Sequence, residues 1–263
     1  MYMRLFHSSV FVLLLCACSE KVETITFDTV TVDKVVALSN DSVPPTCSVN
    51  IRLEKATPES GRAGEIINTT VAQRLLQRGD DNMQEAAQAF ADDYTANYVK
   101  TLLPLYNEDR GDTKKHAWYH YHYIINSHTQ IGSKGTVVYL ADINYREGGN
   151  HAINHQVIMN FEEETGRELT ARDIFVDGFE ATLKPILLKA LQEKTGNATM
   201  KALNDNGYLT HAEIHVPQNF ILSSNAITFV YNPDEIAPDS IGCIELTISF
   251  ADIDNILKTT FEH

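Results

Sequence analysis

The sequence predicts an α+β fold, in which helices pack against a largely antiparallel sheet. Three observations lead to this prediction. Segments that alternate apolar and polar residues, as half-buried strands do, occur in groups. Segments with apolar residues three and four positions apart, as in amphipathic helices, are also grouped, so strands and helices do not alternate regularly. The chain has 263 residues, 43% of them hydrophobic, which is enough for one large domain or two smaller ones.

The chain is predicted to divide into four segments. The first is a lipoprotein signal peptide at residues 1–17, and the second is a tether with an extended stretch at 18–46. A smaller α/β part at 47–110 and a C-terminal α+β domain at 111–263 follow. The first boundary depends on a leader motif, and the later ones depend on changes in hydrophobic periodicity.

The leader motif is that of a bacterial lipoprotein. Residues 10–15 form an apolar run that is too short to cross a bilayer as a stable helix. The following Leu15-Cys16-Ala17-Cys18 resembles a lipobox, in which Cys18 is acylated and becomes the mature N-terminus. An ordinary secretory signal would instead leave Cys18 as a free thiol. The sequence therefore predicts membrane attachment through lipid at Cys18 and a place in the cell envelope, with the periplasmic and surface faces both open.

The smaller α/β part should contain strands followed by two helices. Residues 23–38 are rich in Thr and Val and look extended, and residues 47–54 alternate as a half-buried strand does. Apolar residues then recur at helical spacing up to Gly79, and a second helical stripe runs from Met83 to Tyr98. This stripe is interpreted as core packing.

The C-terminal domain should begin with a meander of three strands near 118–126, 136–145 and 152–161. Thr170-Ala-Arg-Asp173 resembles a capping box and predicts a short helix. A longer helix should end at Gly196, and Pro185 inside it predicts either a kink or a start near Lys184. The remaining expected elements are strands at 219–222, 226–231 and 243–250 and a final helix at 251–257.

Three motifs together resemble a bacterial extracytoplasmic domain family of largely unknown function. They are Tyr145-Arg-Glu-Gly-Gly-Asn-His151, Thr165-Gly166-Arg-Glu-Leu169 and Glu235-Ile-Ala-Pro238. The family includes the extracellular domain of the lysozyme-sensing anti-sigma factor RsiV and the N-terminal region of the peptidoglycan deacetylase PdaC. The resemblance implies an extracytoplasmic binding role rather than an enzymatic activity.

The glycine-rich turn of the first motif supplies the candidate ligand-binding residues Gly148, Gly149, Asn150 and His151. Backbone amides of such a turn can cradle an anion. A plain hairpin turn explains the two glycines more simply, because glycine readily adopts positive φ. Asn150 between Gly149 and His151 departs from the family's usual turn.

The charge of the chain bears on its partners. The formal net charge is −14, which repels nucleic acid and anionic lipid surfaces. The same charge would attract a basic protein. The resemblance to RsiV makes a lysozyme-type protein the most specific expectation for such a partner. A cell-wall ligand is the other expected partner, and solubility outside the cell explains the same charge without any partner.

Histidines give the only enzyme interpretation. His120 and His122 should share one face of a strand at about 7 Å, close enough for one metal ion. If the hairpin turns near Ile131, Asp142 lies close to His120 and supplies a third ligand. The alternative function is therefore a hydrolase acting on peptidoglycan or glycan. A solvated strand face explains the histidines more simply, and we expect no cofactor and no catalytic residues.

Two cysteines remain after the leader. Cys47 shares a strand face with Val49, Ile51 and Leu53, whereas Cys243 points away from the apolar face of its own strand. Residues on opposite faces of a sheet cannot form a disulfide. The sequence therefore argues against a Cys47–Cys243 bridge.

Overall fold

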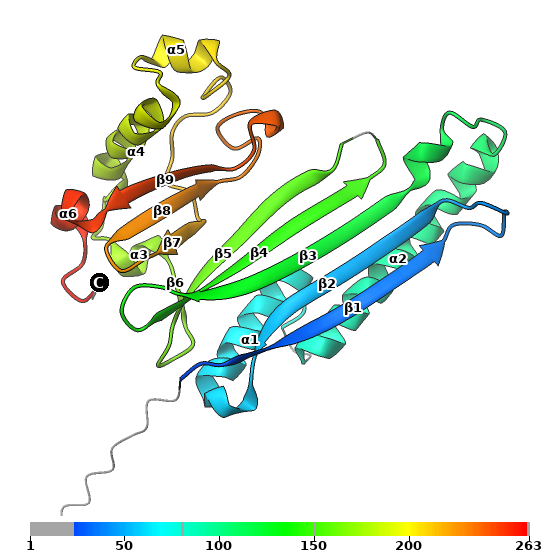
Figure 1. Ribbon diagram of the computed structural model, residues 1–263, viewed down its shortest axis with the longest axis horizontal. Helices are drawn as coiled ribbons and strands as arrows, with labels where there is room; N and C mark the ends of the chain where they lie inside the picture. Colours follow the sequence, from blue (N-terminus) through cyan, green and yellow to red (C-terminus); the bar gives the residue numbers. More distant parts are fainter. Residues whose placement is uncertain (1–23, 80–81, 150, 262–263) are drawn as a thin grey trace, which may run out of the picture.

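The computed structural model describes residues 24–79, 82–149 and 151–261. They form two lobes, each with its own sheet and its own buried core (Figure 1). The first lobe comprises residues 24–169 and the second lobe residues 170–261. The α+β prediction is confirmed, because helices pack against a six-stranded and a three-stranded sheet. Among the described residues, no helix is both long enough and apolar enough to cross a membrane.

The first lobe is built on a six-stranded sheet in the order β1-β2-β3-β4-β5-β6. All neighbours are antiparallel except β2 and β3, which run parallel. The parallel pair is joined by two helices that cover one face of the sheet (Figure 1). The bounds are β1 Phe27–Ala37, β2 Thr46–Ala56, α1 Gly61–Leu76, α2 Met83–Asp109, β3 Tyr121–Ile131, β4 Thr136–Glu147, β5 Ile153–Glu162 and β6 Glu168–Leu169.

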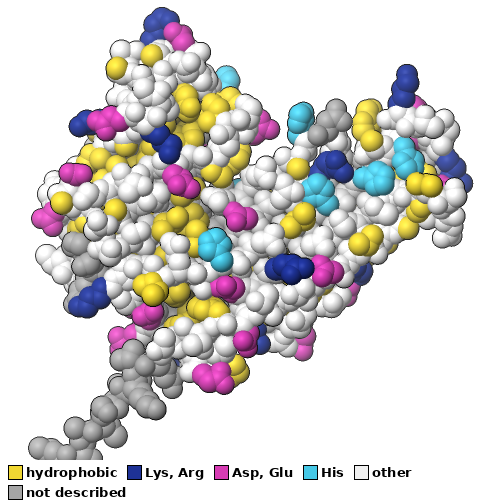
Figure 2. All heavy atoms as spheres, viewed as in Figure 1, with side chains coloured by type: hydrophobic (Ala, Val, Ile, Leu, Met, Phe, Trp, Pro, Cys, Tyr) yellow, Lys and Arg dark blue, Asp and Glu magenta, His cyan; other side chains and the backbone are white. Residues whose placement is uncertain are grey.

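The core of the first lobe lies between this sheet and its helices. Val49, Ile51 and Leu53 alternate along β2 and are fully buried, as the sequence predicts. They pack in one cluster with Ile67 and Val71 of α1. The opposite face of the sheet is open, and Figure 2 shows histidines grouped on it at the end where β3 begins.

Helix α2 begins where the sequence predicts but is longer than expected. Helix α2 continues to Asp109, well beyond the apolar stripe that ends at Tyr98, and Pro104 lies inside it. Its start is fixed by Asn82, whose side chain accepts a hydrogen bond of 2.9 Å from the amide of Glu85. Residues buried farther along the helix, among them Tyr106, pack with the start of β2 and explain the extra turns.

The second lobe pairs a three-stranded antiparallel sheet, in the order β7-β8-β9, with four helices. Its strands are β7 Phe220–Leu222, β8 Ala226–Tyr231 and β9 Ile244–Ser249. Its helices are α3 Ala171–Ile174, α4 Glu180–Thr195, α5 Met200–Asp205 and α6 Phe250–Ile253. Helix α4 begins at Glu180 with Pro185 inside it, and Gly196 ends it in the left-handed conformation, as predicted.

The lobes are joined by asparagine side chains along the outer edge of β5. Asn219 accepts from the amide of Ile158 at 3.0 Å and donates to the carbonyl of Gln156 at 2.8 Å. Asn232 accepts from the amide of Gln156 at 2.7 Å and donates to its carbonyl at 3.0 Å. These amide groups complete the hydrogen bonds of a strand edge that β6 leaves unpaired.

Asn160 makes the reciprocal contact, from β5 to the second lobe. Its side chain donates to the carbonyl of Phe220 at 2.7 Å and accepts from the amide of Leu222 at 3.0 Å. A small apolar cluster beside this contact contains Ile158 of the first lobe and Val230 of the second. The lobes therefore meet through strand-like hydrogen bonds and a shared apolar patch.

The expected boundary between residues 110 and 111 is wrong, because β2 and β3 pair across it in one sheet. The two cores divide near residue 169 instead. Cys47 and Cys243 are free thiols that lie in different lobes. The parity argument does not apply as expected, because Cys47 lies in β2 whereas Cys243 directly precedes β9 of the second lobe.

Replacing Asn160 with Asp should weaken the junction. The change removes the donor to Phe220 and places a carboxylate at a side chain that is 1% exposed. We expect the free energy of unfolding to fall by about 2 kcal/mol or more. Urea denaturation at neutral pH measures it.

The matched control is Asn154→Asp, at an exposed position of the same strand where the side chain accepts a hydrogen bond from Asn144. Its effect should stay within about 0.5 kcal/mol. Equal stability of the Asn160→Asp variant and the wild type would contradict the role given to this amide.

Candidate functional site between the two lobes

A cavity of about 690 Å³ lies where the two lobes meet. The first lobe contributes side chains from α1, β5 and β6, and the second contributes α3, α4 and the irregular segment 215–218. The cavity therefore exists only because the lobes are held side by side. Its apolar lining residues are Ile158, Leu169, Ala171, Phe179, Val216, Pro217 and Phe220.

Charged side chains line the same cavity. Arg74, Arg172 and Lys184 are basic, and Glu168 and Glu180 are acidic. Arg74 donates to both carboxylate oxygens of Glu168, at 3.0 and 3.3 Å. Burial raises the pKa of Glu168 above its ordinary value, and the guanidinium of Arg74 opposes this shift. Arg74 and Glu168 therefore largely neutralise each other.

The other two basic side chains lie on the second lobe. Arg172 is in α3 and Lys184 is in α4, and both are exposed. Neither forms an ion pair with a residue that the structure describes, although Glu180 lies one helical turn before Lys184. These two cations are therefore available to a ligand.

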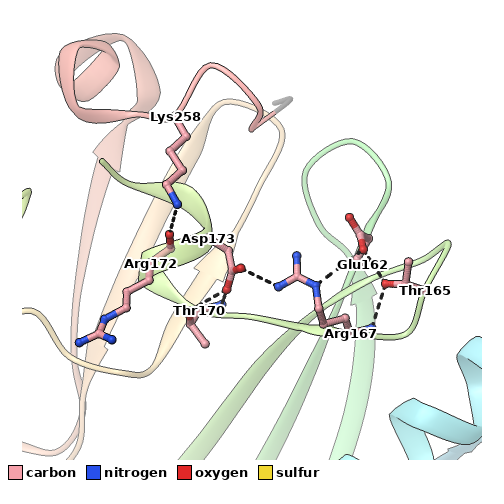
Figure 3. Close-up of polar contacts among 7 residues, drawn as sticks. All are labelled: Glu162, Thr165, Arg167, Thr170, Arg172, Asp173 and Lys258. Carbon is pink, nitrogen blue, oxygen red and sulfur yellow. Dashed lines mark hydrogen bonds and ion pairs between the residues drawn. The ribbon is translucent and has the colours of Figure 1, made fainter. Parts of the chain in front are cut away.

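A polar network holds the chain between β6 and α3, next to the cavity (Figure 3). Asp173 accepts from the amide and hydroxyl of Thr170 at 2.8 and 2.7 Å, and Arg167 donates to it at 2.6 Å. This confirms the capping box. Burial alone would raise the pKa of Asp173, but the hydrogen bonds from Thr170 and Arg167 outweigh it and lower the pKa.

The backbone of Arg172 is held in place beside this network. Lys258 donates to the backbone carbonyl of Arg172 at 2.5 Å and so ties α3 to the C-terminal segment. Figure 3 shows the guanidinium of Arg172 extending away from the other labelled side chains. The backbone at this residue is thus fixed, while its charged group is left outside the network.

His215 completes the rim of the cavity. Its ring lies edge-on to Tyr231, with the centroids 5.4 Å apart, and its Nε2 is 3.6 Å from a carboxylate oxygen of Glu235. The hydroxyl of Tyr231 donates to the carbonyl of His215 at 2.5 Å. Glu235 is part of the Glu-Ile-Ala-Pro motif, so this motif supports the wall of the cavity.

The histidines singled out by the sequence lie elsewhere, on the open face of the first lobe. His122 lies opposite Arg146 on β4, and its Nε2 is 2.7 Å from the side-chain oxygen of Asn144. His120 accepts at Nδ1 from the amide of Thr46 at 3.3 Å. Both rings therefore have ordinary hydrogen-bond partners.

The proposed metal ligands do not come together. Strand register places Asp142 opposite Asn126, so it is not opposite His120 as expected. Asp142 instead accepts from Gln156 at 2.8 Å. Within the described ranges, no three His, Cys, Asp or Glu side chains are placed to hold a metal ion. The expected approach of Asp142 to His120 is therefore wrong, and a hydrolase activity stays an alternative that these three residues do not support as one metal site.

The glycine-rich turn joins β4 to β5, as predicted. Gly148 and Gly149 have φ of 82° and 73°, which explains the two glycines. A side chain at Gly148 would approach the carbonyl of Trp118 to 3.0 Å. His151 is exposed, and Asn150 and Cys18 lie outside the described residues. A ligand-binding role for Gly148, Gly149, Asn150 and His151 stays a prediction.

The cavity could not be predicted from the sequence. Its charged residues, from Arg74 to His215, come from five separate segments, and each alone looks like a solvated surface residue. Only the capping box around Arg172 was a usable local signal, and it indicated a helix start rather than a binding site.

Most of the second lobe matches a known domain family, whereas the first-lobe side of the cavity lies outside the match. Residues 172–251 match the family described as "Protein of unknown function (DUF3298)". The matched residues extend over the second lobe from α3 to the start of α6 and include Arg172, Lys184 and His215. No curated protein matches the chain.

Two solved structures of DUF3298 proteins resemble the whole chain. One, from Bacteroides fragilis, superposes with a TM-score of 0.84 at 26% identity, over 91% of this chain and 96% of that one. The other, from Pseudomonas aeruginosa, has a TM-score of 0.59 at 18% identity, over 91% and 97%, and supports the fold alone. These comparisons do not test the resemblance to RsiV and PdaC, which stays a prediction.

His120 should make stability depend on pH. Burial, followed by His116 and Arg146, lowers the pKa of His120. Its contribution to folding is therefore present above the unfolded pKa of about 6.5 and is lost as the pH falls further. Between about pH 6.5 and about pH 5, the melting temperature of the wild type should fall more than that of His120→Gln.

The control is His128→Gln, at an exposed position of β3, the strand that begins directly after His120. Melting curves followed by circular dichroism across this pH range give the comparison. The assignment is wrong if the His128 variant reduces the pH dependence as much as the His120 variant does.

Proposed function

We propose that this protein is a lipid-anchored cell-envelope protein that binds a small ligand, without catalysis, in the cavity between its lobes. The cavity of about 690 Å³ is the observation that carries the proposal. Small-molecule sites are typically clefts of roughly 300–1,000 Å³, often at domain interfaces, with an apolar lining and a few polar groups. The volume of this cavity lies in that range and the cavity lies where the two lobes meet, and its lining combines an apolar wall with charged side chains.

The lining supports binding more than catalysis. Glu168 is engaged by Arg74, and His215 by its contacts with Tyr231 and Glu235. Neither side chain is paired with a nucleophile that it could activate. The groups that face the cavity therefore suit contact with a ligand rather than proton transfer.

The anchor is proposed from the lipobox at Cys18. A lipid there would hold the two lobes near the membrane through the short segment before β1, which begins at Phe27. A single acyl chain binds a membrane only marginally, and stable attachment needs more than one. A basic protein ligand of lysozyme type, suggested by the net charge of −14, also stays a prediction.

Lipidation is tested by Cys18→Ser. The wild type, expressed in a bacterium with the lipoprotein pathway, should gain the mass of acyl chains and partition into the detergent phase. The variant should lack both properties. The matched control is Cys47→Ser, since Cys47 is a buried core thiol. Intact-mass spectrometry decides, and an unmodified wild-type N-terminus rules out the anchor.

The cavity is tested by filling it. Val216→Trp should lower the affinity for the neutral fluorogenic probe phenylnaphthylamine at least about tenfold, because the larger ring occupies the apolar wall. Glu213→Trp, at an exposed position of the same segment outside the lining, should bind like the wild type. Fluorescence titration measures both, and circular dichroism checks that each variant is folded. Equal affinities for the two variants would place the probe elsewhere.

A further inference from the structure

The charges of the cavity differ from those of the protein around it. The chain carries a formal net charge of −14. The cavity lining has three fixed cations, Arg74, Arg172 and Lys184, against two carboxylates, Glu168 and Glu180. The lining of this cavity thus carries an excess of positive charge in an otherwise acidic protein, and this excess indicates the charge of a ligand.

Two of the three cationic side chains in the lining remain for a ligand, because the third is paired within the lining. Arg74 and Glu168 are held together by two hydrogen bonds on the first-lobe side. On the second-lobe side, Arg172 and Lys184 face a single carboxylate, Glu180, and neither forms an ion pair with a described residue. The unneutralised positive charge therefore lies on the second lobe, at α3 and the first turns of α4.

The rest of the lining selects for an apolar group. Phe179 and Phe220 are 7% and 2% exposed, and they present part of their surface to the cavity beside Val216 and Pro217. A purely hydrophilic anion would leave this wall in contact with water. A ligand with an apolar body and an acidic head would cover the wall and reach the two cations at once.

We infer that the cavity binds an amphipathic organic anion, with its apolar body against Phe179 and Phe220 and its acidic head at Arg172 and Lys184. The inference rests on the proposed function and adds the chemical class of the ligand. The head is a carboxylate, sulfonate or phosphate, all of which accept charge-assisted hydrogen bonds from guanidinium and ammonium groups.

A pair of fluorogenic probes tests the inference. Anilinonaphthalene sulfonate and phenylnaphthylamine share one aromatic body and differ in the presence of the sulfonate. The wild type should bind the sulfonate about tenfold more tightly than the neutral probe, which is the effect expected of roughly one net charge-assisted contact. Val216→Trp should weaken the binding of both probes, which locates them in the cavity.

The double variant Arg172→Gln/Lys184→Gln should remove the preference. Its affinity for the sulfonate should fall about tenfold, to that of the neutral probe, whose own affinity should not change. The matched control is Lys189→Gln, on the same helix outside the lining, where Lys189 pairs with Glu193 at 3.6 Å. This control should bind both probes like the wild type.

The outcomes separate the inference from the proposed function. If the wild type binds the neutral probe as tightly as the sulfonate, the cavity stands and the anionic ligand is overturned. A double variant that keeps the full preference also overturns it. Failure of both probes to bind in a manner sensitive to Val216→Trp would overturn the binding function itself.

Discussion

The packing of the two lobes depends on asparagine side chains that make the hydrogen bonds which the backbone of a neighbouring strand would otherwise make. A β-strand edge presents amide and carbonyl groups that must find partners when they are buried. On the outer edge of β5, beyond the short β6, these partners are the carboxamides of Asn219 and Asn232 from the second lobe. The carboxamide of Asn160 likewise pairs with backbone groups of β7. The two sheets are thereby coupled without forming a continuous sheet.

This coupling places the candidate site. The amide contacts fix the position of β7 against β5, and the segment that leads into β7 forms one wall of the cavity. The opposite wall comes from α1 and β6 of the first lobe. A change in the angle between the lobes would therefore alter the cavity directly, whereas it would leave each core intact.

The histidines at one end of the open face do not form a comparable site. His120 and His122 have hydrogen-bond partners within the sheet, and the strand register separates them from Asp142. Only His122 lies in β3, and His120 directly precedes that strand. Asp142 does not lie opposite His120 as expected, because a shift in the position of the hairpin turn moves every residue of the opposite strand.

The sequence by itself determined the elements and the class of fold. Periodicity predicted the strands of both sheets except the short β6, and it predicted the main helices. Gly196 and the Thr170–Asp173 capping box marked helix ends, and alternation identified Val49, Ile51 and Leu53 as core. These features depend on neighbours within a few residues, which a sequence displays directly. Only the tertiary structure decided the lobe boundary, the register of Asp142 and the cavity. Each of these depends on contacts between segments far apart in the chain, and side chains such as Arg74 and Lys184 carry no local sign of what they face.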